Sequence, residues 1–196
     1  MIKNLIFDWG GVLIKGEHNG HILQIIKEKF NLTLDHDFWV EHKRRLDQNK
    51  WTLDKFQKEI EKDFDIILSI REIKEIIAKS ITPNKELLKE LPILKQKYRL
   101  FMLSNNDHFT VQYSKEKYPQ MFNQFEYCYI SCDRKFHKKQ PEAWLELLKE
   151  QKLNAKECIF IDDMKKNTDV AKKLKIKIIK FENNEQFNEE LSKLTK

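Results

Sequence analysis

The chain has 196 residues, a length that suits one α/β domain with an insertion or two small domains. Hydrophobic residues make up 40% of it and phenylalanine alone contributes 13, which excludes an intrinsically disordered chain. The formal net charge is +6, but the lysines are scattered and accompany no nucleic-acid-binding motif. We therefore expect no nucleic-acid partner. The densest basic group falls in one helix-to-strand stretch and is interpreted as solvated faces: Lys165, Lys166, Lys172, Lys173, Lys175 and Lys177.

The first residues, the apolar stretches and the cysteines bear on the cellular location of the protein. An apolar run starts at Ile2, which leaves no room for a secretory signal, and no apolar stretch approaches the ~18 residues of a membrane span. We expect a cytoplasmic protein with no membrane partner. Cys128, Cys132 and Cys158 lie in or beside strand-like runs without zinc-type spacing, so we interpret them as core thiols.

The segment from Asn4 to Leu13 is the most informative in the sequence. Its apolar run ends on Asp8, and Gly10 and Gly11 follow. All four glycines of the chain lie in the first 20 residues, and glycine allows tight turns and a close approach of ligands. A carboxylate at the end of a strand, beside such a turn, is typical of the functional edge of an α/β sheet. Taken alone, the segment also fits a strand followed by an ordinary turn that Asp8 caps.

Residues 19 to about 80 contain no convincing strand, and their apolar residues recur at helical spacing. Four short amphipathic helices are predicted, on Ile22, Leu23, Ile25, Ile26 and Phe30; on Phe38, Trp39 and His42; on Leu53, Phe56, Ile60 and Phe64 after a possible N-cap at Thr52; and on Leu68, Ile70, Ile73, Ile76 and Ile77. Trp39 and Trp51 could line a pocket, although aromatic residues at this spacing are usually core.

From residue 82 onward, predicted strands alternate with helices. Thr82 and Pro83 resemble an N-cap and a first-turn proline, which predicts a helix through about residue 96. Strands are predicted at 99–103, 127–130, 158–161 and 176–180, and helices at 141–148 and 165–174. This alternation indicates an α/β fold with a Rossmann-like parallel sheet between helices. We expect residues 1–15 and 82–196 to form this core, and residues 16–81 to form an inserted four-helix cap over its carboxyl edge.

Three of the predicted strands end in polar side chains: Asp8, Ser104–Asn105 and Asp162–Asp163. Parallel strands bring their carboxyl ends to one edge of the sheet, so these side chains should converge. Carboxylates that converge repel each other unless a cation lies between them, and hard oxygen ligands favour Mg²⁺. A hydroxyl and an amide can donate to phosphate oxygens, and Lys138 could neutralise their charge. The set suits phosphoryl transfer, although each residue alone also fits a cap or a solvated side chain.

At these positions the chain resembles the haloacid dehalogenase-like (HAD) hydrolase superfamily, over essentially its whole length. The resemblance lies in Phe7–Leu13, Leu103–Asn105, Lys138 with Pro141–Glu142, and Phe160–Asp163 followed by Asn167. Each motif is weak by itself, but all four in order, at strand ends, are specific. The branch that the chain resembles is that of small-capped phosphatases related to α-glucose-1-phosphate phosphatase.

The resemblance implies a Mg²⁺-dependent phosphatase in which Asp8 is the nucleophile and forms an aspartyl-phosphate. The residues that it implies for Mg²⁺ are Asp8, Gly10 through its backbone carbonyl, Asp163 as the principal side-chain ligand, and Asp162 in support. The residues that it implies for the phosphate are Ser104, Asn105 and Lys138. The partner would be a small phosphorylated metabolite of the sugar phosphate type, and the enzyme a monomer or weak homodimer.

The chain departs from the family pattern at position 10, where a second aspartate usually acts as general acid and base. Gly10 retains the carbonyl but cannot transfer a proton, a function typically worth roughly 10²–10⁴-fold in rate. We therefore expect a preference for good leaving groups, as in sugar 1-phosphates, acyl phosphates or aryl phosphates. Glu17, His18 or His108 could substitute for the missing group. Lys139 stands where a proline is usual, so either Lys138 or Lys139 could contact the phosphate.

Two other functions fit the same residues. A metal-independent 2-haloacid dehalogenase would keep Asp8 as nucleophile and needs no second aspartate, because halide leaves without a proton. It would leave Asp162 and Asp163 without a role. A catalytically silent HAD-like module would bind a phosphorylated ligand or a protein partner. Dinucleotide binding is disfavoured because the glycines do not form a GxGxxG motif.

Overall fold

The computed structural model describes residues 1–15, 25–32 and 36–196, and for residues 36–40 the backbone only. Its centre is a five-stranded sheet in the order β3-β2-β1-β4-β5, in which every neighbouring pair is parallel. The strands are β1 (Asn4–Phe7), β2 (Arg99–Ser104), β3 (Tyr127–Ile130), β4 (Cys158–Asp162) and β5 (Lys177–Lys180). The predicted Rossmann-like α/β class is confirmed.

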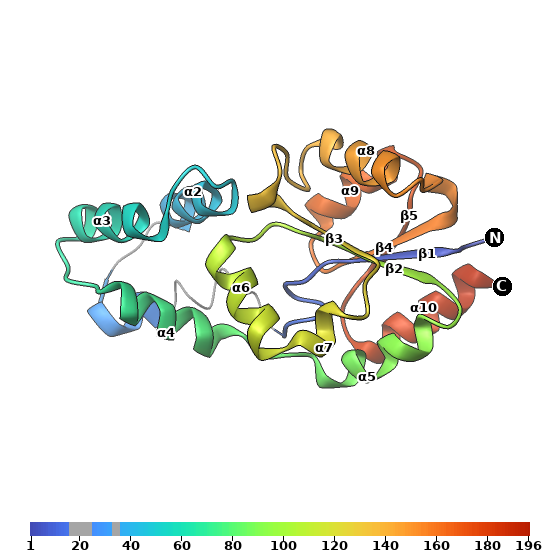
Figure 1. Ribbon diagram of the computed structural model, residues 1–196, viewed down its shortest axis with the longest axis horizontal. Helices are drawn as coiled ribbons and strands as arrows, with labels where there is room; N and C mark the ends of the chain where they lie inside the picture. Colours follow the sequence, from blue (N-terminus) through green and yellow to red (C-terminus); the bar gives the residue numbers. More distant parts are fainter. Residues whose placement is uncertain (16–24, 33–35) are drawn as a thin grey trace.

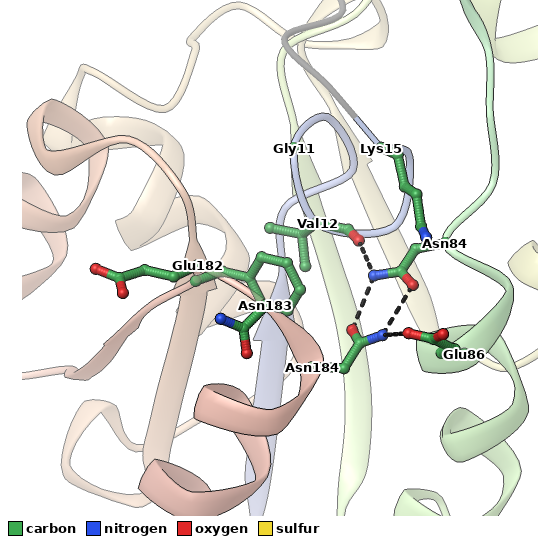
Figure 2. A pocket seen from close by; sticks show the side chains of 9 residues that line it. Gly11, Val12, Lys15, Asn84, Glu86, Glu182, Asn183 and Asn184 are labelled. Carbon is green, nitrogen blue, oxygen red and sulfur yellow. Dashed lines mark hydrogen bonds between the residues drawn. The ribbon is translucent and has the colours of Figure 1, made fainter.

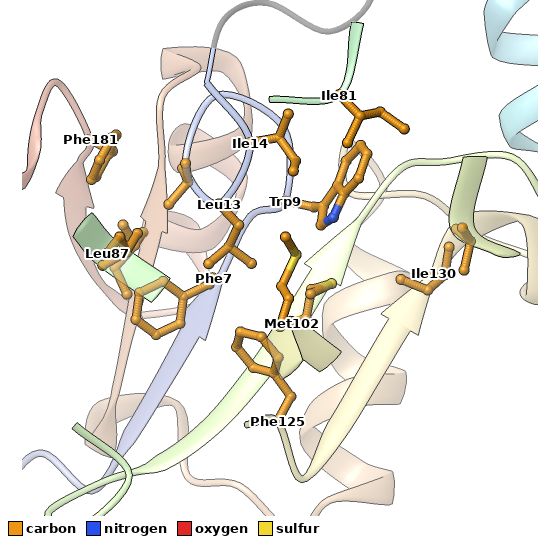
Figure 3. Close-up of a cluster of buried hydrophobic side chains, with 14 of the residues drawn as sticks. Phe7, Trp9, Leu13, Ile14, Ile81, Leu87, Met102, Phe125, Ile130 and Phe181 are labelled. Carbon is orange, nitrogen blue, oxygen red and sulfur yellow. The ribbon is translucent and has the colours of Figure 1, made fainter. Parts of the chain in front are cut away.

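Side chains of the three central strands alternate between two apolar clusters. On β1, Leu5 and Phe7 belong to one cluster and Ile6 to the other, and β2 and β4 alternate in the same way. This period of two, with both faces buried, explains why the strands are continuous apolar runs in the sequence. In Figure 3, Phe7 lies between Leu87 and Phe125 on one face of the sheet. The centroids of the Phe7 and Phe125 rings are 6.0 Å apart.

Helices cover both faces of the sheet, with α8 and α9 on one side and α5, α7 and α10 on the other (Figure 1). The helices of this region are α5 (Lys85–Leu94), α6 (His108–Lys117), α7 (Pro119–Phe122), α8 (Pro141–Glu150), α9 (Lys165–Lys173) and α10 (Asn184–Thr195), with 3₁₀ turns η1 (Ser131–Asp133) and η2 (Ala155–Glu157). Trp144 of α8 packs edge-on against Phe160 of β4, with ring centroids 4.5 Å apart. Both layers therefore bury aromatic side chains against the strands.

Three helices between β1 and β2 lie beyond the carboxyl ends of the strands (Figure 1): α2 (His36–Asp47), α3 (Leu53–Phe64) and α4 (Ile70–Ser80). Residues 25–30 are also helical, as predicted. Thr52 caps α3, as predicted, and its side chain accepts a hydrogen bond from the N–H of Lys55. Ser69 and Glu72 form a capping box at the start of α4. The assignment of residues 16–81 to a cap domain stays a prediction.

Some predictions for this insertion concern residues that the structure does not describe. Ile22 and Leu23 lie outside the described residues, as do the side chains of Phe38 and Trp39. Trp51 is half-buried, and the guanidinium of Arg45 lies 4.8 Å from the centroid of its ring. It packs against the apolar cluster that Phe7 also joins, which favours the core interpretation of this tryptophan.

The prediction that Thr82 and Pro83 begin a helix is wrong. Thr82 accepts a hydrogen bond from the N–H of Lys15 (2.7 Å), and Pro83 forms a β-bridge with Ile14. The chain pairs here with the segment that follows β1, so helix α5 starts only at Lys85. Its cap is Asn84, whose Oδ1 accepts from the N–H of Leu87 (3.4 Å).

The exposure of the lysines and of the cysteines agrees with their interpretation as solvated faces and as core thiols. The lysines of the helix-to-strand stretch from residue 165 to residue 177 are exposed. The three cysteines are free thiols; Cys132 and Cys158 are buried and Cys128 is half-buried. Across the described part of the chain, no helix is both long enough and apolar enough to span a membrane.

Candidate active site

Three carboxylates meet where β1 and β4 end. Asp8 directly follows β1, Asp162 is the last residue of β4, and Asp163 comes next. One oxygen of each lies within 4.8 Å of the others. Asp8 is 5% exposed and Asp162 is fully buried, whereas Asp163 is half-buried. The N–H of Asp8 donates to the carbonyl of Ile161 (2.8 Å), which continues the pairing of the strands up to the acidic residues.

Lys138 places its ammonium between two of these carboxylates. Its Nζ lies 2.5 Å from Oδ2 of Asp8 and 2.9 Å from Oδ2 of Asp162, and its side chain is 4% exposed. The backbone of Lys138 is held from two sides: its N–H donates to Oδ1 of Asn105 (3.0 Å), and Nε1 of Trp144 donates to its carbonyl (2.9 Å). Lys139 is exposed, so the structure brings Lys138, and not Lys139, to the carboxylates.

Burial and charge act in opposite directions on this cluster. Burial raises the pKa of Asp8, the Lys138 ammonium opposes that rise, and the Asp162 carboxylate adds to it. Burial lowers the pKa of Lys138, but the carboxylates of Asp162 and Asp8 outweigh burial and raise it above its ordinary value. The ammonium therefore stays charged at neutral pH, which provides a fixed positive charge beside Asp8.

Asp162 is held by more donors than its position in the sequence suggests. Nδ2 of Asn167 donates to both of its oxygens (3.1 and 3.0 Å), and the N–H of Met164 donates to Oδ1 (2.8 Å). With Lys138, three residues occupy this carboxylate. Asn167 belongs to the fourth motif, but its contact with Asp162 was not predicted. The five-residue spacing of Asp162 and Asn167 could have indicated this contact, since an asparagine in the first turn of α9 can reach back to the end of β4.

Gly11 provides the space in which Asp163 lies. Its φ is +73°, in the left-handed region that glycine adopts without penalty. A Cβ at this position would lie 2.2 Å from Oδ2 of Asp163, far inside contact distance. The glycine turn thus permits the third carboxylate to join the other two. The resulting set of oxygen donors fits Mg²⁺, a hard cation that prefers carboxylate and carbonyl oxygens.

The remaining predicted residues lie near this edge of the sheet. Ser104 ends β2, in register with Ile130 of β3, and is buried. Asn105 is half-buried and contacts Lys138 as described. Gly10 lies in the turn after Asp8 and forms a β-bridge with Ile14.

Of the three residues predicted to substitute for the missing general acid and base, the structure describes only His108. Glu17 and His18 lie outside the described residues. His108 is the first residue of α6, and its Nδ1 lies 3.4 Å from Oδ1 of Asp133. Among the described residues, the ion-pair partner of His108 is Asp133 and not Asp8.

A second buried charge cluster joins α2 to the segments that follow β2 and β3, and it was not predicted. Lys43 of α2 pairs with Asp47 one turn later and with Oδ2 of Asp107 (3.1 Å), and all three residues are buried. Asp107 also caps α6 by accepting from the N–H of Thr110 (2.9 Å). The carbonyl of Asp47 accepts from Oγ of Ser131 (2.6 Å). The spacing of Lys43 and Asp47 was visible in the sequence, whereas their partner in the core was not.

A pocket of about 270 Å³ borders the same glycine turn (Figure 2). In it, Asn84 and Asn184 exchange hydrogen bonds of 2.9 and 3.1 Å. Nδ2 of Asn84 also donates to the carbonyl of Val12 (3.0 Å), and Asn184 donates to Glu86 (2.7 Å). These amides attach the turn that carries Gly11 to α5 and α10.

A parallel α/β sheet with carboxylates at adjoining strand ends, and a buried lysine in contact with them, is typical of enzymes that work at the carboxyl edge of the sheet. The chain belongs to the haloacid dehalogenase-like hydrolase family, whose family model matches residues 2–174. It is therefore a HAD-like hydrolase, as the resemblance of its motifs predicted.

Several known proteins are similar over almost the whole chain. The D-ribitol-5-phosphate phosphatase of Bacteroides thetaiotaomicron is 25% identical over 207 residues, which cover 98% of each protein. A crystal structure of a HAD family enzyme from the same organism has a TM-score of 0.84 and 23% identity, with 97% of this chain and 98% of that chain covered. A wild-type complex of a HAD family enzyme of that organism with magnesium and inorganic phosphate has a TM-score of 0.74 and 26% identity, over 93% and 95% of the chains.

Proposed function

We propose that the chain is a Mg²⁺-dependent phosphatase that hydrolyses a small phosphomonoester through an aspartyl-phosphate on Asp8. The observation that carries this proposal is the buried contact of Lys138 with Asp8 and Asp162, with Asp163 alongside. A nucleophilic carboxylate, a fixed cation and a set of oxygen donors are the components that phosphoryl transfer needs. The similar phosphatase and the similar complex with magnesium and phosphate support this function.

Asp8, Asp163 and the carbonyl of Gly10 would hold Mg²⁺, with Asp162 in support. In this proposal Asp163 is the principal side-chain ligand, and Asp162, whose oxygens accept hydrogen bonds from Asn167, lies in support. When bound, Mg²⁺ supplies positive charge that offsets the charge of the phosphoryl oxygens.

In the first step, a carboxylate oxygen of Asp8 attacks phosphorus, and the bond from phosphorus to the leaving oxygen breaks. Lys138 donates to a phosphoryl oxygen, and the hydroxyl of Ser104 and the amide of Asn105 donate to the others. In the second step, water attacks phosphorus and the bond to Asp8 breaks, which releases phosphate and restores the carboxylate. The proton of that water passes to phosphate or to solvent.

Gly10 determines which substrates this mechanism favours. No side chain at position 10 can give a proton to the leaving oxygen, so substrates whose leaving groups need none should react fastest. We propose a sugar phosphate type of substrate, with sugar 1-phosphates, acyl phosphates and aryl phosphates ahead of polyol phosphates. A primary alcohol, the leaving group of a polyol 5-phosphate, depends most on the missing acid.

We also propose that residues 16–81 act as a cap domain on a core formed by residues 1–15 and 82–196. The helices α2, α3 and α4 lie beyond the strand ends that carry the carboxylates (Figure 1). The ion pair of Lys43 with Asp107 connects this insertion to the loop that follows β2. Such a cap is suited to select the small phosphorylated metabolite.

Phosphate release by the whole chain tests this function. Protein treated with EDTA is assayed with and without added Mg²⁺ on a panel of sugar 1-phosphates, acyl phosphates, aryl phosphates and D-ribitol 5-phosphate. Asp8→Asn should reduce turnover on the order of 10⁴-fold or more, since it removes the nucleophile. The matched control is Asp169→Asn, at a partly exposed aspartate that pairs with Lys165 on α9.

With 2-haloacids assayed alongside these phosphates, each outcome points to one of the three functions. Phosphate release that requires Mg²⁺ and Asp8 supports the proposal. Halide release from 2-haloacids without metal would indicate a dehalogenase. Binding of a phosphorylated compound with no turnover of either kind would indicate a silent module.

A further inference from the structure

We propose that His108, Cys132 and Asp133 form a second cation site, separate from the carboxylate site, that takes Zn²⁺ or a cation of similar chemistry. His108 begins α6, and the other two residues lie in η1, the turn that follows β3. One ligand atom of each lies within 4.8 Å of the other two. The sequence shows no zinc-type spacing because the imidazole comes from a different strand-to-helix connection than the thiol.

The imidazole and carboxylate already have the spacing of two ligands on one ion. Nδ1 of His108 lies 3.4 Å from Oδ1 of Asp133. Two ligands bonded at roughly 2.0–2.1 Å with tetrahedral geometry lie about 3.4 Å apart. A small movement of the thiol would complete a three-ligand set, because its sulfur is within 4.8 Å of both.

Exposure and charge around these residues determine where a cation would lie. The Cys132 residue is 3% exposed, whereas the His108 and Asp133 side chains are 56% and 52% exposed. An ion would therefore lie at the surface with water as a further ligand. The carboxylates of Asp133, Asp107 and Asp47 place negative charge near the Cys132 thiol, which favours a cation. Lys43 offsets part of the charge of Asp47 and Asp107.

The donor types separate this site from the carboxylate site. Thiolate and imidazole favour Zn²⁺ and related cations, whereas Mg²⁺ prefers a set of oxygen ligands. Zn²⁺ binding would displace the thiol proton and join the start of α6 to η1. His108 follows Asn105 closely in the chain, so an ion there would fix the end of a loop that also carries a proposed phosphate-binding residue.

Titration with Co²⁺ tests the site directly. The whole protein, reduced and freed of metal, is titrated while the near-ultraviolet absorbance is recorded, because a thiolate bound to Co²⁺ gives a charge-transfer band and oxygen ligands do not. We expect a band that saturates at one equivalent, disappears when Zn²⁺ is added and persists when Mg²⁺ is added. Absence of the band at saturating Co²⁺ overturns the proposal.

Four variants locate the ion. Cys132→Ser should lose the band, and Cys128→Ser, at a half-buried thiol, should keep it. Asp133→Asn changes a side chain that is 52% exposed, so the fold should persist. It should weaken Co²⁺ binding at least as much as the roughly 10–100-fold that loss of an outer-shell partner costs. Asp163→Asn should keep the band.

A band that survives Cys132→Ser, or unchanged Co²⁺ affinity in Asp133→Asn, contradicts the proposal. A band lost in Asp163→Asn would show that the thiolate-bound ion depends on the carboxylate site, which contradicts the proposal of a separate site. No turnover is measured, so the result does not depend on the phosphatase function proposed above.

Discussion

Nζ of Lys43 lies 3.1 Å from Oδ2 of Asp107, and the two residues belong to different parts of the fold. Lys43 comes from α2 in the insertion, and Asp107 is the N-cap of the core helix α6. Each side chain is 5% exposed, so the pair is shielded from the screening that weakens surface ion pairs. The insertion is therefore attached to the core by a buried charge as well as by apolar packing.

Replacing this lysine should destabilise the protein strongly. Lys43→Met leaves the carboxylates of Asp47 and Asp107 buried without their cation, which should lower the free energy of unfolding by about 3–5 kcal/mol. Urea denaturation measures the change. Lys50→Met, at an exposed lysine just after α2, should stay within about 0.5 kcal/mol of wild type. If both variants unfold at the same urea concentration, the cluster does not hold the insertion.

Lys138→Met should change the effect of Mg²⁺ on stability. Without the ammonium, the buried carboxylates of Asp8 and Asp162 repel each other, and the free energy of unfolding should fall by about 3–5 kcal/mol in the absence of metal. Added Mg²⁺ should raise the Tm of this variant more than that of wild type, because it replaces the lost positive charge. Turnover should be lost. Lys139→Met, at the exposed neighbour, should reproduce wild type in all three measurements.

Gly11→Ala should disturb the position of Asp163. The left-handed conformation alone costs an alanine about 1–2 kcal/mol, and the new methyl group meets Oδ2 of Asp163 at 2.2 Å. Half-maximal activity should then require more Mg²⁺. In an Asp163→Ala background, Gly11→Ala should lower the free energy of unfolding only by the backbone strain and should leave the Mg²⁺ requirement unchanged. An unaltered Mg²⁺ requirement in Gly11→Ala would show that Asp163 does not contribute to metal binding.

Gly10→Asp should restore proton transfer to the leaving group. Among the described residues, Gly11 and not Gly10 is the glycine with positive φ, so an aspartate fits the backbone at position 10. Turnover of D-ribitol 5-phosphate should rise by roughly 10²–10⁴-fold, while turnover of an aryl phosphate should change little. The ratio of the two rates is the informative quantity. If it does not change, another group already supplies the proton.

The local signals in the sequence were sufficient for most of the fold. Apolar runs of strand length that end on acids placed β1 and β4, and alternation with helices indicated the parallel sheet. Thr52 was found because its cap is a contact between residues close in sequence. The cap at Thr82 was wrong for the opposite reason: the carbonyl of Thr82 bonds to Lys15, which lies far away along the chain.

In the candidate site, too, the sequence could place some residues and contacts but not others. Asp8 and Asp162 could be placed because the topology of a parallel sheet brings strand ends together. Lys138 lies in the loop before α8 and was a candidate through its motif. The choice between Lys138 and Lys139 needed the structure, because neighbouring lysines differ only in the direction of their side chains. The close approach of Gly11 to Asp163 joins segments that lie far apart in the sequence, which no periodicity encodes.

The amide pair of Asn84 and Asn184 connects the last helix to the turn that follows β1. The family model ends at residue 174, before α10 begins, yet α10 reaches the carbonyl of Val12 through this pair. Substitutions at the start of the C-terminal helix can therefore shift the turn beside Asp8. Under the proposed function, evolution could tune turnover there without altering any group that contacts the substrate.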